Sequence, residues 1–225
     1  MARRRKLNDR AARHDTAYRR AKQENFAARA IYKLEEIDKR FRVIKPRASV
    51  LDLGCWPGSW MQYAATRVGP EGHVFGIDLR PVELALPGWV AHEVADVNDW
   101  SPEGAIAAAG RRFDVVLSDM APQTTGDRAS DQWRSEALLL RALELARAAL
   151  RPGGHFVGKV FQAGRFPELL GELRASFQEA KAYQAKHTRA GSSEQYLIGR
   201  GLRINIAAEQ ARDRASAHDR ADESD

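Results

Sequence analysis

The architecture of this chain can be inferred from its residues 50–60, Val50-Leu51-Asp52-Leu53-Gly54-Cys55-Trp56-Pro57-Gly58-Ser59-Trp60. The mostly apolar residues before Gly54 predict a buried strand. Gly54 and Gly58 allow the backbone to approach a ligand closely, and the bend leads into a helix predicted at residues 59–68. In open parallel sheets a ligand binds beyond the carboxyl ends of the strands, so this loop is a candidate binding site.

Strands and helices alternate along the rest of the chain. The hydrophobic periodicity predicts strands at residues 49–53, 73–77, 90–94, 113–117 and 155–161, separated by helices at residues 59–68, 102–109, 131–150 and 166–177. Residues 180–186 and 194–202 predict an antiparallel hairpin, and an apolar stripe predicts an amphipathic helix over residues 24–41. We therefore expect a single Rossmann-like α/β domain with a mostly parallel, doubly wound sheet and a C-terminal antiparallel hairpin.

The predicted loop favours a nucleoside ligand that carries no phosphate. A dinucleotide site is expected to contain G-x-G-x-x-G, whereas here Pro57 stiffens the loop and Trp60 adds a surface for stacking. S-adenosylmethionine is such a ligand, and its sulfonium and amino groups are cationic. Matching negative charge is expected at successive strand ends, from Asp52, Asp78, Asp96 and Asp119. The alternative is that the glycines only form a turn and the Asp residues only cap helices.

Asp78 is also a candidate for binding a ribose. It follows the glycine loop by about 20 residues, the usual distance for a carboxylate that binds a ribose diol.

Charge is distributed unevenly along the chain. The chain has 225 residues and a formal net charge of +6. Residues 1–22 contain nine Lys or Arg and two Asp, so the remainder is close to neutral. Such a basic N-terminal arm favours a polyanionic, RNA-like partner, although a solubilising segment has the same composition. Residues 207–225 contain six acidic residues and three Arg, which predicts a disordered acidic tail and leaves the folded domain at residues 23–206.

Several classes of protein are excluded by what the sequence lacks. No stretch approaches the roughly 18 consecutive apolar residues of a membrane helix, and no apolar segment typical of a secretion signal is present. The single cysteine, Cys55, cannot form an internal disulfide, and the six histidines lack metal-ligand spacing. We therefore predict a cytoplasmic protein with no membrane partner and no metal site.

Two lysines occur where a strand or a helix is expected to be apolar. Lys159 interrupts the apolar run at residues 156–161, in a strand that should be covered on both faces. Asp119 ends the preceding parallel strand and should lie beside Lys159, so the pair is either functional or a simple buried ion pair. Lys33 lies at the edge of an apolar helical stripe, where a lysine can also extend to solvent.

At this point the sequence resembles the FtsJ/RrmJ (RlmE) family of ribosomal RNA 2′-O-ribose methyltransferases. The resembling segments are Ala30–Ile37, Leu51–Trp60, Ser118–Pro122, Gly158–Gln162 and Ser192–Tyr196, and together they span about residues 15–202. The family is marked by a Lys-Asp-Lys-Glu tetrad, which falls on Lys33, Asp119, Lys159 and Glu194. The resemblance also implies donor contacts at Gly58, Trp60, Asp78, Asp96 and Asp119. The chain departs from many members at Cys55-Trp56 and at Ser59.

The resemblance implies a function and a role for each member of the tetrad. It implies S-adenosylmethionine-dependent 2′-O-methylation of a uridine in 23S ribosomal RNA, within the large (50S) subunit, by a monomer. Lys159 would be the base, with Lys33 as a nearby cation that orients the hydroxyl. Asp119 would fix Lys159, and Glu194 would hold Lys33 or the substrate ribose. Residues 1–22, continued by Arg29, Lys39, Arg40 and Arg42, would bind the RNA backbone.

Three other functions remain open from the sequence. The same chemistry serves 2′-O-methyltransferases that act on tRNA or on an mRNA cap. A non-catalytic RNA-binding module for ribosome assembly could keep the fold without the reaction. A nicotinamide dehydrogenase shares the fold class, but the missing third glycine and Pro57 argue against it.

Overall fold

The computed structural model describes residues 26–28, 30–122, 125–162, 164–186 and 193–204. The predicted basic arm at residues 1–22, Arg29 and the predicted tail at residues 207–225 lie outside these ranges. The helices are α2 (Ile31–Phe41), α3 (Ser59–Val68), α4 (Glu103–Ala109), α5 (Arg128–Ala149) and α6 (Phe166–Ser176). The strands are β1 (Ser49–Leu53), β2 (His73–Asp78), β3 (Val90–Val94), β4 (Phe113–Ser118), β5 (Leu150–Phe161), β6 (Phe177–Tyr183) and β7 (Glu194–Leu202).

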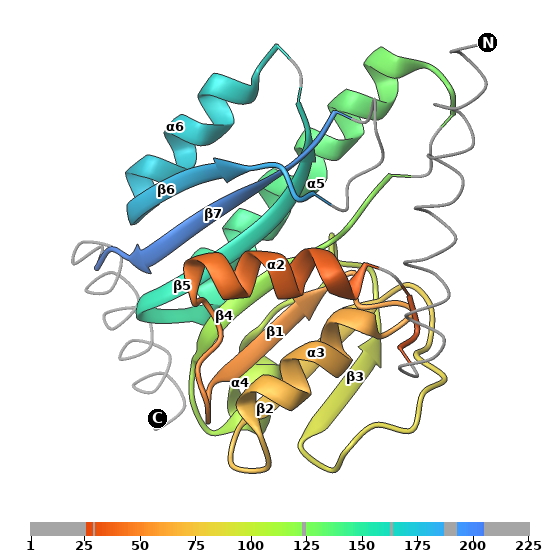
Figure 1. The fold of residues 1–225 in the computed structure, drawn as a ribbon, viewed down its shortest axis with the longest axis vertical. Coiled ribbons are helices and arrows are strands. Elements are labelled where there is room, and N and C mark those ends of the chain that lie inside the picture. Colours follow the sequence, from red (N-terminus) through yellow and green to blue (C-terminus); the bar gives the residue numbers. More distant parts are fainter. Residues whose placement is uncertain (1–25, 29, 123–124, 163, 187–192, 205–225) are drawn as a thin grey trace, which may run out of the picture.

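The strands form one sheet in the order β3-β2-β1-β4-β5-β7-β6 (Figure 1). Strands β1 to β5 are parallel to one another, and β7 is antiparallel to both β5 and β6. The prediction of a mostly parallel, doubly wound sheet with a C-terminal antiparallel hairpin is therefore confirmed.

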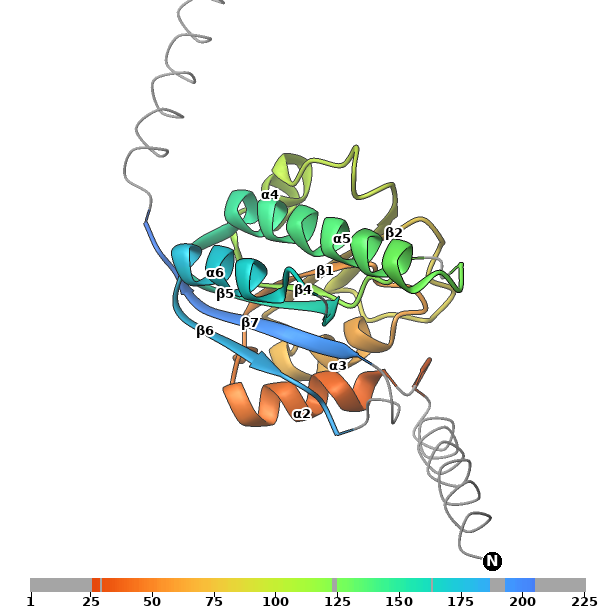
Figure 2. The same cartoon turned by 90° about the horizontal axis from the view of Figure 1, so that it is seen from above.

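Helices cover both faces of the sheet. Figure 2 shows α2 and α3 on one face and α4, α5 and α6 on the other. All five residues of β1 are buried, as expected of a central strand in a sheet covered on both sides. Leu51 and Leu53 pack in the apolar layer that includes α5, whereas Val50 packs in the layer that includes α2 and α3. No helix within the described residues is long and apolar enough to cross a membrane.

Three predicted boundaries are wrong for physical reasons that the structure makes plain. Helix α2 begins at Ile31 rather than near residue 24, because the preceding backbone bonds to α3: Ala27 N–H donates to Gln62 Oε1 at 2.9 Å. Strand β5 begins at Leu150, which pairs with Phe113 of β4, so the expected helix stop at residues 152–154 lies inside a strand.

The last strands also differ from the prediction. Strand β6 covers Phe177–Tyr183 rather than residues 180–186. The chain leaves the sheet after Tyr183, where the Lys186 N–H donates to the Glu36 carboxylate of α2 at 3.0 Å.

The carboxyl ends of the parallel strands meet at one edge of the sheet. Asp52, Asp78 and Asp119 lie at or just beyond the ends of β1, β2 and β4. Because β7 runs in the opposite direction, its first residue, Glu194, arrives at the same edge. This edge, called the carboxyl edge below, therefore collects acidic residues from four segments of the chain.

Candidate active site

Register in the sheet places Lys159 beside Asp119. Ser118, the last residue of β4, pairs with Gly158 of β5, so the next residues in each strand are neighbours. The Lys159 ammonium nitrogen lies 3.1 Å from Asp119 Oδ1 and also donates to the Asp119 backbone carbonyl. The Lys159 side chain is only 8% exposed, so its charge depends on these two oxygens rather than on water.

Lys33 reaches the same edge from the helix above the sheet. It lies in the first turn of α2, and its ammonium nitrogen lies 2.6 Å from Glu194 Oε1 at the start of β7. Both side chains are largely buried, at 15% and 12% exposure. Two separate ion pairs, each joining distant parts of the chain, therefore occupy the carboxyl edge.

Tyr196 connects the two ion pairs. It is paired with Lys159 across β5 and β7, and it follows Glu194 by two residues, so all three side chains are on one face of the sheet. Its hydroxyl donates to Asp119 Oδ1 at 2.8 Å, and the Lys33 nitrogen lies 5.9 Å from the centre of its ring. The predicted tetrad is thus brought together around a fifth residue that the sequence analysis did not assign to the site.

The environment of Tyr196 fixes the direction of its hydroxyl hydrogen bond. Burial, followed by the carboxylates of Asp119 and Glu194, raises the pKa of Tyr196 well above its ordinary value. The phenol therefore stays protonated and acts as a donor to Asp119. The signal for this residue was present in the sequence, since a tyrosine in a buried strand requires a hydrogen-bond partner.

Asp52 is a buried carboxylate whose oxygens lack hydrogen bonds within the described residues. It is fully buried, and neither of its oxygens has a hydrogen-bond partner among the described residues. Burial, followed by the charges of Asp119 and Asp78, raises its pKa well above the ordinary value. A positively charged group placed near Asp52 would therefore be strongly favoured, as the cationic end of S-adenosylmethionine requires.

The glycine loop is shaped by its contacts on both sides. Gly54 and Gly58 have φ values of 78° and 105°, which disfavour residues with a side chain. A Cβ atom on Gly54 would lie 2.5 Å from Met120 Cγ, and one on Gly58 would lie 2.6 Å from Leu84 Cδ1. The positive φ values and the close neighbours together favour glycine at both positions. The contacts on both sides of the loop define the path of the backbone at residues 54–58.

Asp78 holds two loops together at the end of β2. Its two carboxylate oxygens accept hydrogen bonds from the backbone N–H groups of Trp56 and Arg80, both at 3.0 Å. The guanidinium carbon of Arg80 lies 3.7 Å from the centre of the Trp56 ring, and that ring is 43% exposed. Trp56, the departure noted in the sequence, is therefore on the surface beside Asp78.

Trp60 differs from its predicted role as a stacking surface. Its side chain is 2% exposed, its ring lies 5.9 Å from that of Tyr196, and its indole N–H donates to the Ala30 carbonyl at 2.9 Å. The indole is therefore part of the packing between α2, α3 and β7. The predicted contact between Trp60 and the donor stays a prediction.

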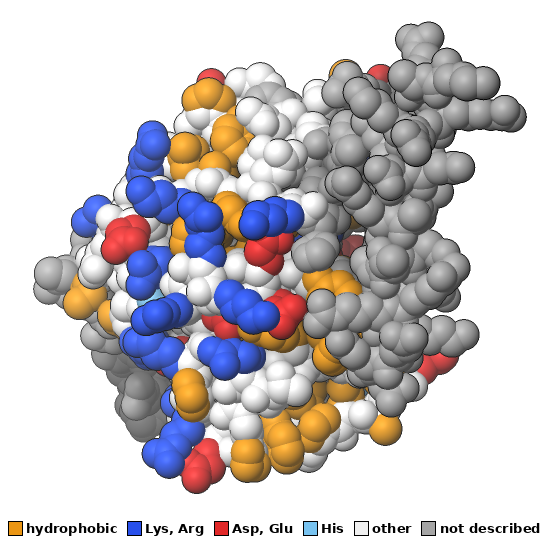
Figure 3. Space-filling view, viewed as in Figure 1, with side chains coloured by type: hydrophobic (Ala, Val, Ile, Leu, Met, Phe, Trp, Pro, Cys, Tyr) orange, Lys and Arg blue, Asp and Glu red, His pale blue; other side chains and the backbone are white. Residues whose placement is uncertain are grey.

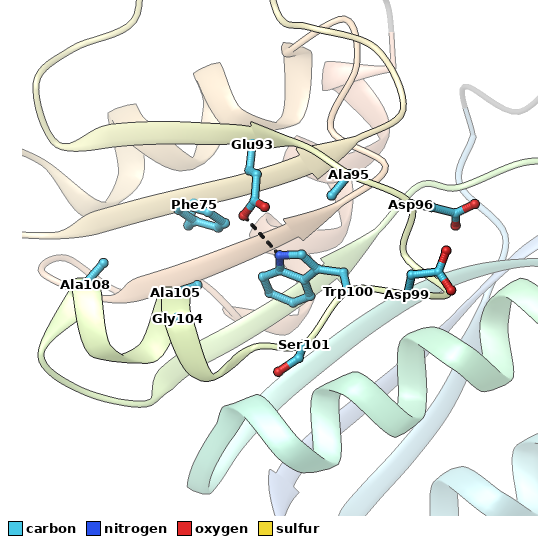
Figure 4. Close-up of a pocket in the computed structure, with 10 residues that line it drawn as sticks. All are labelled: Phe75, Glu93, Ala95, Asp96, Asp99, Trp100, Ser101, Gly104, Ala105 and Ala108. Atoms are coloured by element: carbon cyan, nitrogen blue, oxygen red, sulfur yellow. Dashed lines mark hydrogen bonds between the residues drawn. The ribbon is translucent and has the colours of Figure 1, made fainter.

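Asp96 follows β3, next to Ala95, whose N–H donates to the Asp78 carbonyl at 3.0 Å. The Asp96 Oδ1 accepts hydrogen bonds from the backbone and side-chain amides of Asn98, each at 2.9 Å, so it organises the turn after β3. It also lines a cavity of about 540 Å³ between β2, β3 and α4 (Figure 4). Inside this cavity the Trp100 indole N–H donates to Glu93 at 3.1 Å. Of the predicted site residues only Asp96 lines this cavity, which is distinct from the tetrad.

Cys55 has no feature of a reactive thiol. It is 3% exposed, and burial, followed by the charges of Asp52 and Asp78, raises the pKa of its thiol. The thiolate that nucleophilic chemistry needs is therefore disfavoured, and Cys55 is a packed residue of the core.

Comparisons with known proteins agree with this geometry. Residues 26–202 match the model of the FtsJ-like methyltransferase family. The chain is 47% identical over 189 residues to the ribosomal RNA large subunit methyltransferase E of Syntrophobacter fumaroxidans, covering 84% of this chain and 96% of that protein. It is 46% identical over 187 residues to the protein of the same name in Bdellovibrio bacteriovorus, covering 82% and 95%.

A solved structure has the same fold. It is a Plasmodium falciparum protein described as a ribosomal RNA methyltransferase, with a TM-score of 0.69 and 24% identity, covering 79% of this chain and 98% of that one. Sheet, loop and helices are therefore arranged alike in two proteins of low sequence identity.

Proposed function

The chain belongs to the FtsJ-like methyltransferase family, and from that premise we propose that it methylates the 2′-hydroxyl of a uridine ribose in large-subunit (23S) ribosomal RNA. The methyl donor is S-adenosylmethionine. The protein acts as a monomer in the cytoplasm, on RNA of the large ribosomal subunit. The observation that carries the proposal is the convergence of Lys33, Asp119, Lys159 and Glu194 at the carboxyl edge, beside the glycine loop.

The residues around the glycine loop suit the donor. Asp52 is a buried carboxylate that lacks a partner, and a cationic ligand would satisfy it. The loop at residues 54–58, Asp78 and Asp96 hold the rest of the donor. S-adenosylmethionine, when bound, supplies a methyl group on a positively charged sulfur that a nucleophile can take up.

The tetrad prepares the ribose hydroxyl for attack. A hydroxyl group is a poor nucleophile unless a base removes or polarises its proton. Lys159 acts in its neutral amine form: the amine takes up the proton that the 2′-hydroxyl loses and becomes an ammonium, and its nitrogen is held in place by two oxygens of Asp119. Because general-base catalysis contributes about 10²–10⁴-fold to a rate, the position of this one nitrogen determines much of the turnover.

Lys33 stabilises the oxygen on which negative charge develops. Its ammonium group is fixed by Glu194 and lies against the Tyr196 ring, so it needs no rearrangement during the reaction. A fixed positive charge in a largely buried site stabilises an anionic oxygen more than the same charge does in water. Tyr196 holds Asp119 and, through it, Lys159.

The assay uses tritiated S-adenosylmethionine with three RNA substrates. Undermethylated large ribosomal subunits, free 23S RNA and total tRNA are incubated with the purified protein. We expect label in large-subunit RNA, recovered after digestion as 2′-O-methyluridine. Label in tRNA alone would instead support the alternative 2′-O-methyltransferase, and RNA binding without any label would support a non-catalytic module.

The first prediction concerns the base. Lys159→Met should lower turnover about 10²–10⁴-fold, because the hydroxyl proton loses its acceptor. Lys181→Met, at an exposed lysine of β6, is the matched control and should leave turnover unchanged. Calorimetry with S-adenosylhomocysteine verifies that both variants still bind nucleoside. Near-normal turnover of Lys159→Met would show that another group is the base.

A further inference from the structure

The two edges of the sheet carry opposite charge. The carboxyl edge contains the aspartates that suit the donor, together with Asp119 and Glu194. The opposite edge, where the parallel strands begin, contains six cations that we call the amino-edge cluster: Arg42, Lys45, Arg47, Arg111, Arg151 and Arg200. These residues come from two connecting segments, from the start of β5 and from the last part of β7.

Members of the cluster touch one another or share a partner. The Arg111 guanidinium donates to the backbone carbonyl of Arg47 at 2.6 Å. Asp114 is shared, since Arg151 Nε lies 2.6 Å from its Oδ1 and Arg111 Nη2 lies 3.7 Å from its Oδ2. Arg47, Arg111 and Arg151 are therefore adjacent to one another in the cluster.

Positive charge exceeds negative charge in this cluster. Its carboxylate partners are Glu71 with Arg47, Asp114 with two arginines, and Glu179 with Arg200. Arg42 and Lys45 are exposed, and neither has a carboxylate partner within the described part of the chain. Six cations thus face three carboxylates.

The positive charge of the cluster contributes to the lowered pKa values of two histidines. Burial, followed by the charges of Arg200, Lys45 and Arg151, lowers the pKa of His155. Burial and then the charge of Arg111 lower the pKa of His73. Four members of the cluster therefore act on these two histidines as positive charge.

Helix dipoles account for only part of the cluster. Cations in the last turn of a helix are favoured by the dipole, which explains Lys39 and Arg40 in α2. Arg42 is the C-cap residue of α2, and Arg111 and Arg151 directly follow the C-caps of α4 and α5, so the dipole favours these three as well. Lys45, Arg47 and Arg200 lie farther from a helix end, so helix dipoles do not account for the whole cluster. Figure 3 shows Lys and Arg gathered over the left end of α2 and the adjacent ends of β6 and β7.

We propose that the amino-edge cluster binds phosphates of the ribosomal RNA at a distance from the target nucleotide. The inference rests on the proposed function, because it assumes an RNA substrate. The carboxyl edge must accept the target ribose although its donor-binding aspartates repel phosphates, so attraction for the RNA backbone has to come from other surfaces. Helix α2 spans about 15 Å along its axis and joins Lys33 at one edge to Arg42 at the other.

The test removes three charges from one connection. The variant carries Arg42→Asn, Lys45→Gln and Arg47→Asn, with Asn chosen at 42 and 47 because both residues have positive φ. None of the three touches the tetrad or the glycine loop. The matched control, Arg134→Gln with Arg165→Gln and Arg174→Gln, removes the same charge from exposed positions on α5, α6 and the turn before α6.

Binding to purified large ribosomal subunits is measured between 50 and 200 mM salt. We expect the dependence of log Kd on log salt to become shallower by about 2 for the cluster variant, since each lost phosphate contact removes about 0.7–0.9. Affinity at 100 mM salt should fall about tenfold or more. Donor affinity and turnover at saturating RNA should stay within about twofold of the original values, and the control variant should keep the original slope.

Two outcomes would overturn the inference. An unchanged slope in the cluster variant means that these residues do not meet phosphate, and an equal change in the control means that only net charge matters. In both cases methylation by the unaltered protein would leave the proposed function intact. If the unaltered protein neither binds nor methylates large subunits, the proposed function and the inference fail together.

Discussion

Asp52 is the residue at which binding of a ligand and stability of the fold oppose each other. Its carboxylate is fully buried and has no hydrogen-bond partner among the described residues. Its pKa in the folded protein is raised well above the ordinary value of 3.8, first by burial and then by Asp119 and Asp78. A group with a raised folded-state pKa stabilises the fold below its unfolded pKa and loses that contribution as pH rises through the folded pKa.

Asp52→Asn should therefore stabilise the donor-free protein at neutral pH. The gain should be larger at pH 8 than at pH 5, at about 1.4 kcal/mol for each unit by which the folded-state pKa is raised, because the substitution removes the cost of ionising a buried carboxylate. The same change should weaken S-adenosylmethionine binding by about tenfold or more, because a cationic ligand loses its counter-charge. Urea unfolding at both pH values and calorimetry with the donor measure these effects. Equal stability of the two proteins at both pH values would show that Asp52 is compensated.

Trp56 and Arg80 form the second residue-scale test. Their side chains stack 3.7 Å apart, and both backbone N–H groups bind Asp78, so the pair fastens two loops beside the predicted ribose ligand. Trp56→Ala and Arg80→Ala should each weaken donor binding by about two- to fivefold with little change in kcat. An exposed cation–π contact is worth about 0.5–1 kcal/mol, so the double variant should lose less than the sum.

Additive losses in this double-mutant cycle would show that the stack does not act on the donor. Arg80→Lys serves as the conservative control. It retains the charge over the ring and should recover part of the binding.

Single residues differ in how well the sequence predicted their surroundings. The contact between Lys159 and Asp119 could be predicted, because neighbouring parallel strands bring their carboxyl-terminal halves to the same side of the sheet. The Lys33 to Glu194 contact could not be derived from spacing, since it joins residues far apart and depends on how α2 packs. The place of Tyr196 in the site and the burial of the Trp60 indole were not predicted. Both depend on tertiary contacts, which the local sequence pattern does not reveal.

At the scale of elements, the glycine loop that leads from β1 into α3 carries the next prediction. Gly58 precedes α3 with a φ of 105°, and a Cβ there would lie 2.6 Å from Leu84 and 2.8 Å from Val82. Gly58→Ala should therefore move the loop, reduce stability by about 1–3 kcal/mol and weaken donor binding. Gly104 is the control, because a Cβ on it meets nothing within 4 Å.

Gly104→Ala should act in the opposite sense. This residue lies in α4, where alanine is favoured over glycine by about 0.5–1 kcal/mol, so unfolding should require more urea while donor binding stays the same. Equal effects of the two substitutions on donor binding would show that the path of the Gly58 loop is not what holds the donor.

Elements with strong local signals were placed correctly, and elements shaped by their neighbours were not. Strands β1, β3 and β7 and helix α3 have the predicted bounds, and glycines adjoin both β1 and α3. The start of α2 was misplaced because hydrogen bonds from α3 pull the chain out of the helix before Ile31. The start of β5 was predicted too late, because Pro152 and the two glycines after it indicated the end of a helix. Pairing with β4 instead carries the strand through these residues.

At the scale of the whole molecule, the sheet separates charges of opposite sign at its two edges. The acidic residues of the carboxyl edge are required near a cationic donor, and they disfavour a polyanion at the same place. RNA must therefore be attracted by surfaces away from the reaction. Residues 1–22, with nine cations and two aspartates, are the second such source of charge in the sequence.

Deletion of residues 1–22 tests how much of the attraction for RNA comes from this segment and how much comes from the amino-edge cluster. The truncated protein should bind large ribosomal subunits more weakly and with a shallower salt dependence, while its affinity for the donor stays nearly unchanged, because no described donor residue lies in that segment. Combining the deletion with the substitutions at Arg42, Lys45 and Arg47 should reduce the slope further by about 2, since separate phosphate contacts release separate counterions. Loss of donor binding in step with RNA binding would mean that the segment supports the fold, and calorimetry on the truncated protein distinguishes the two cases.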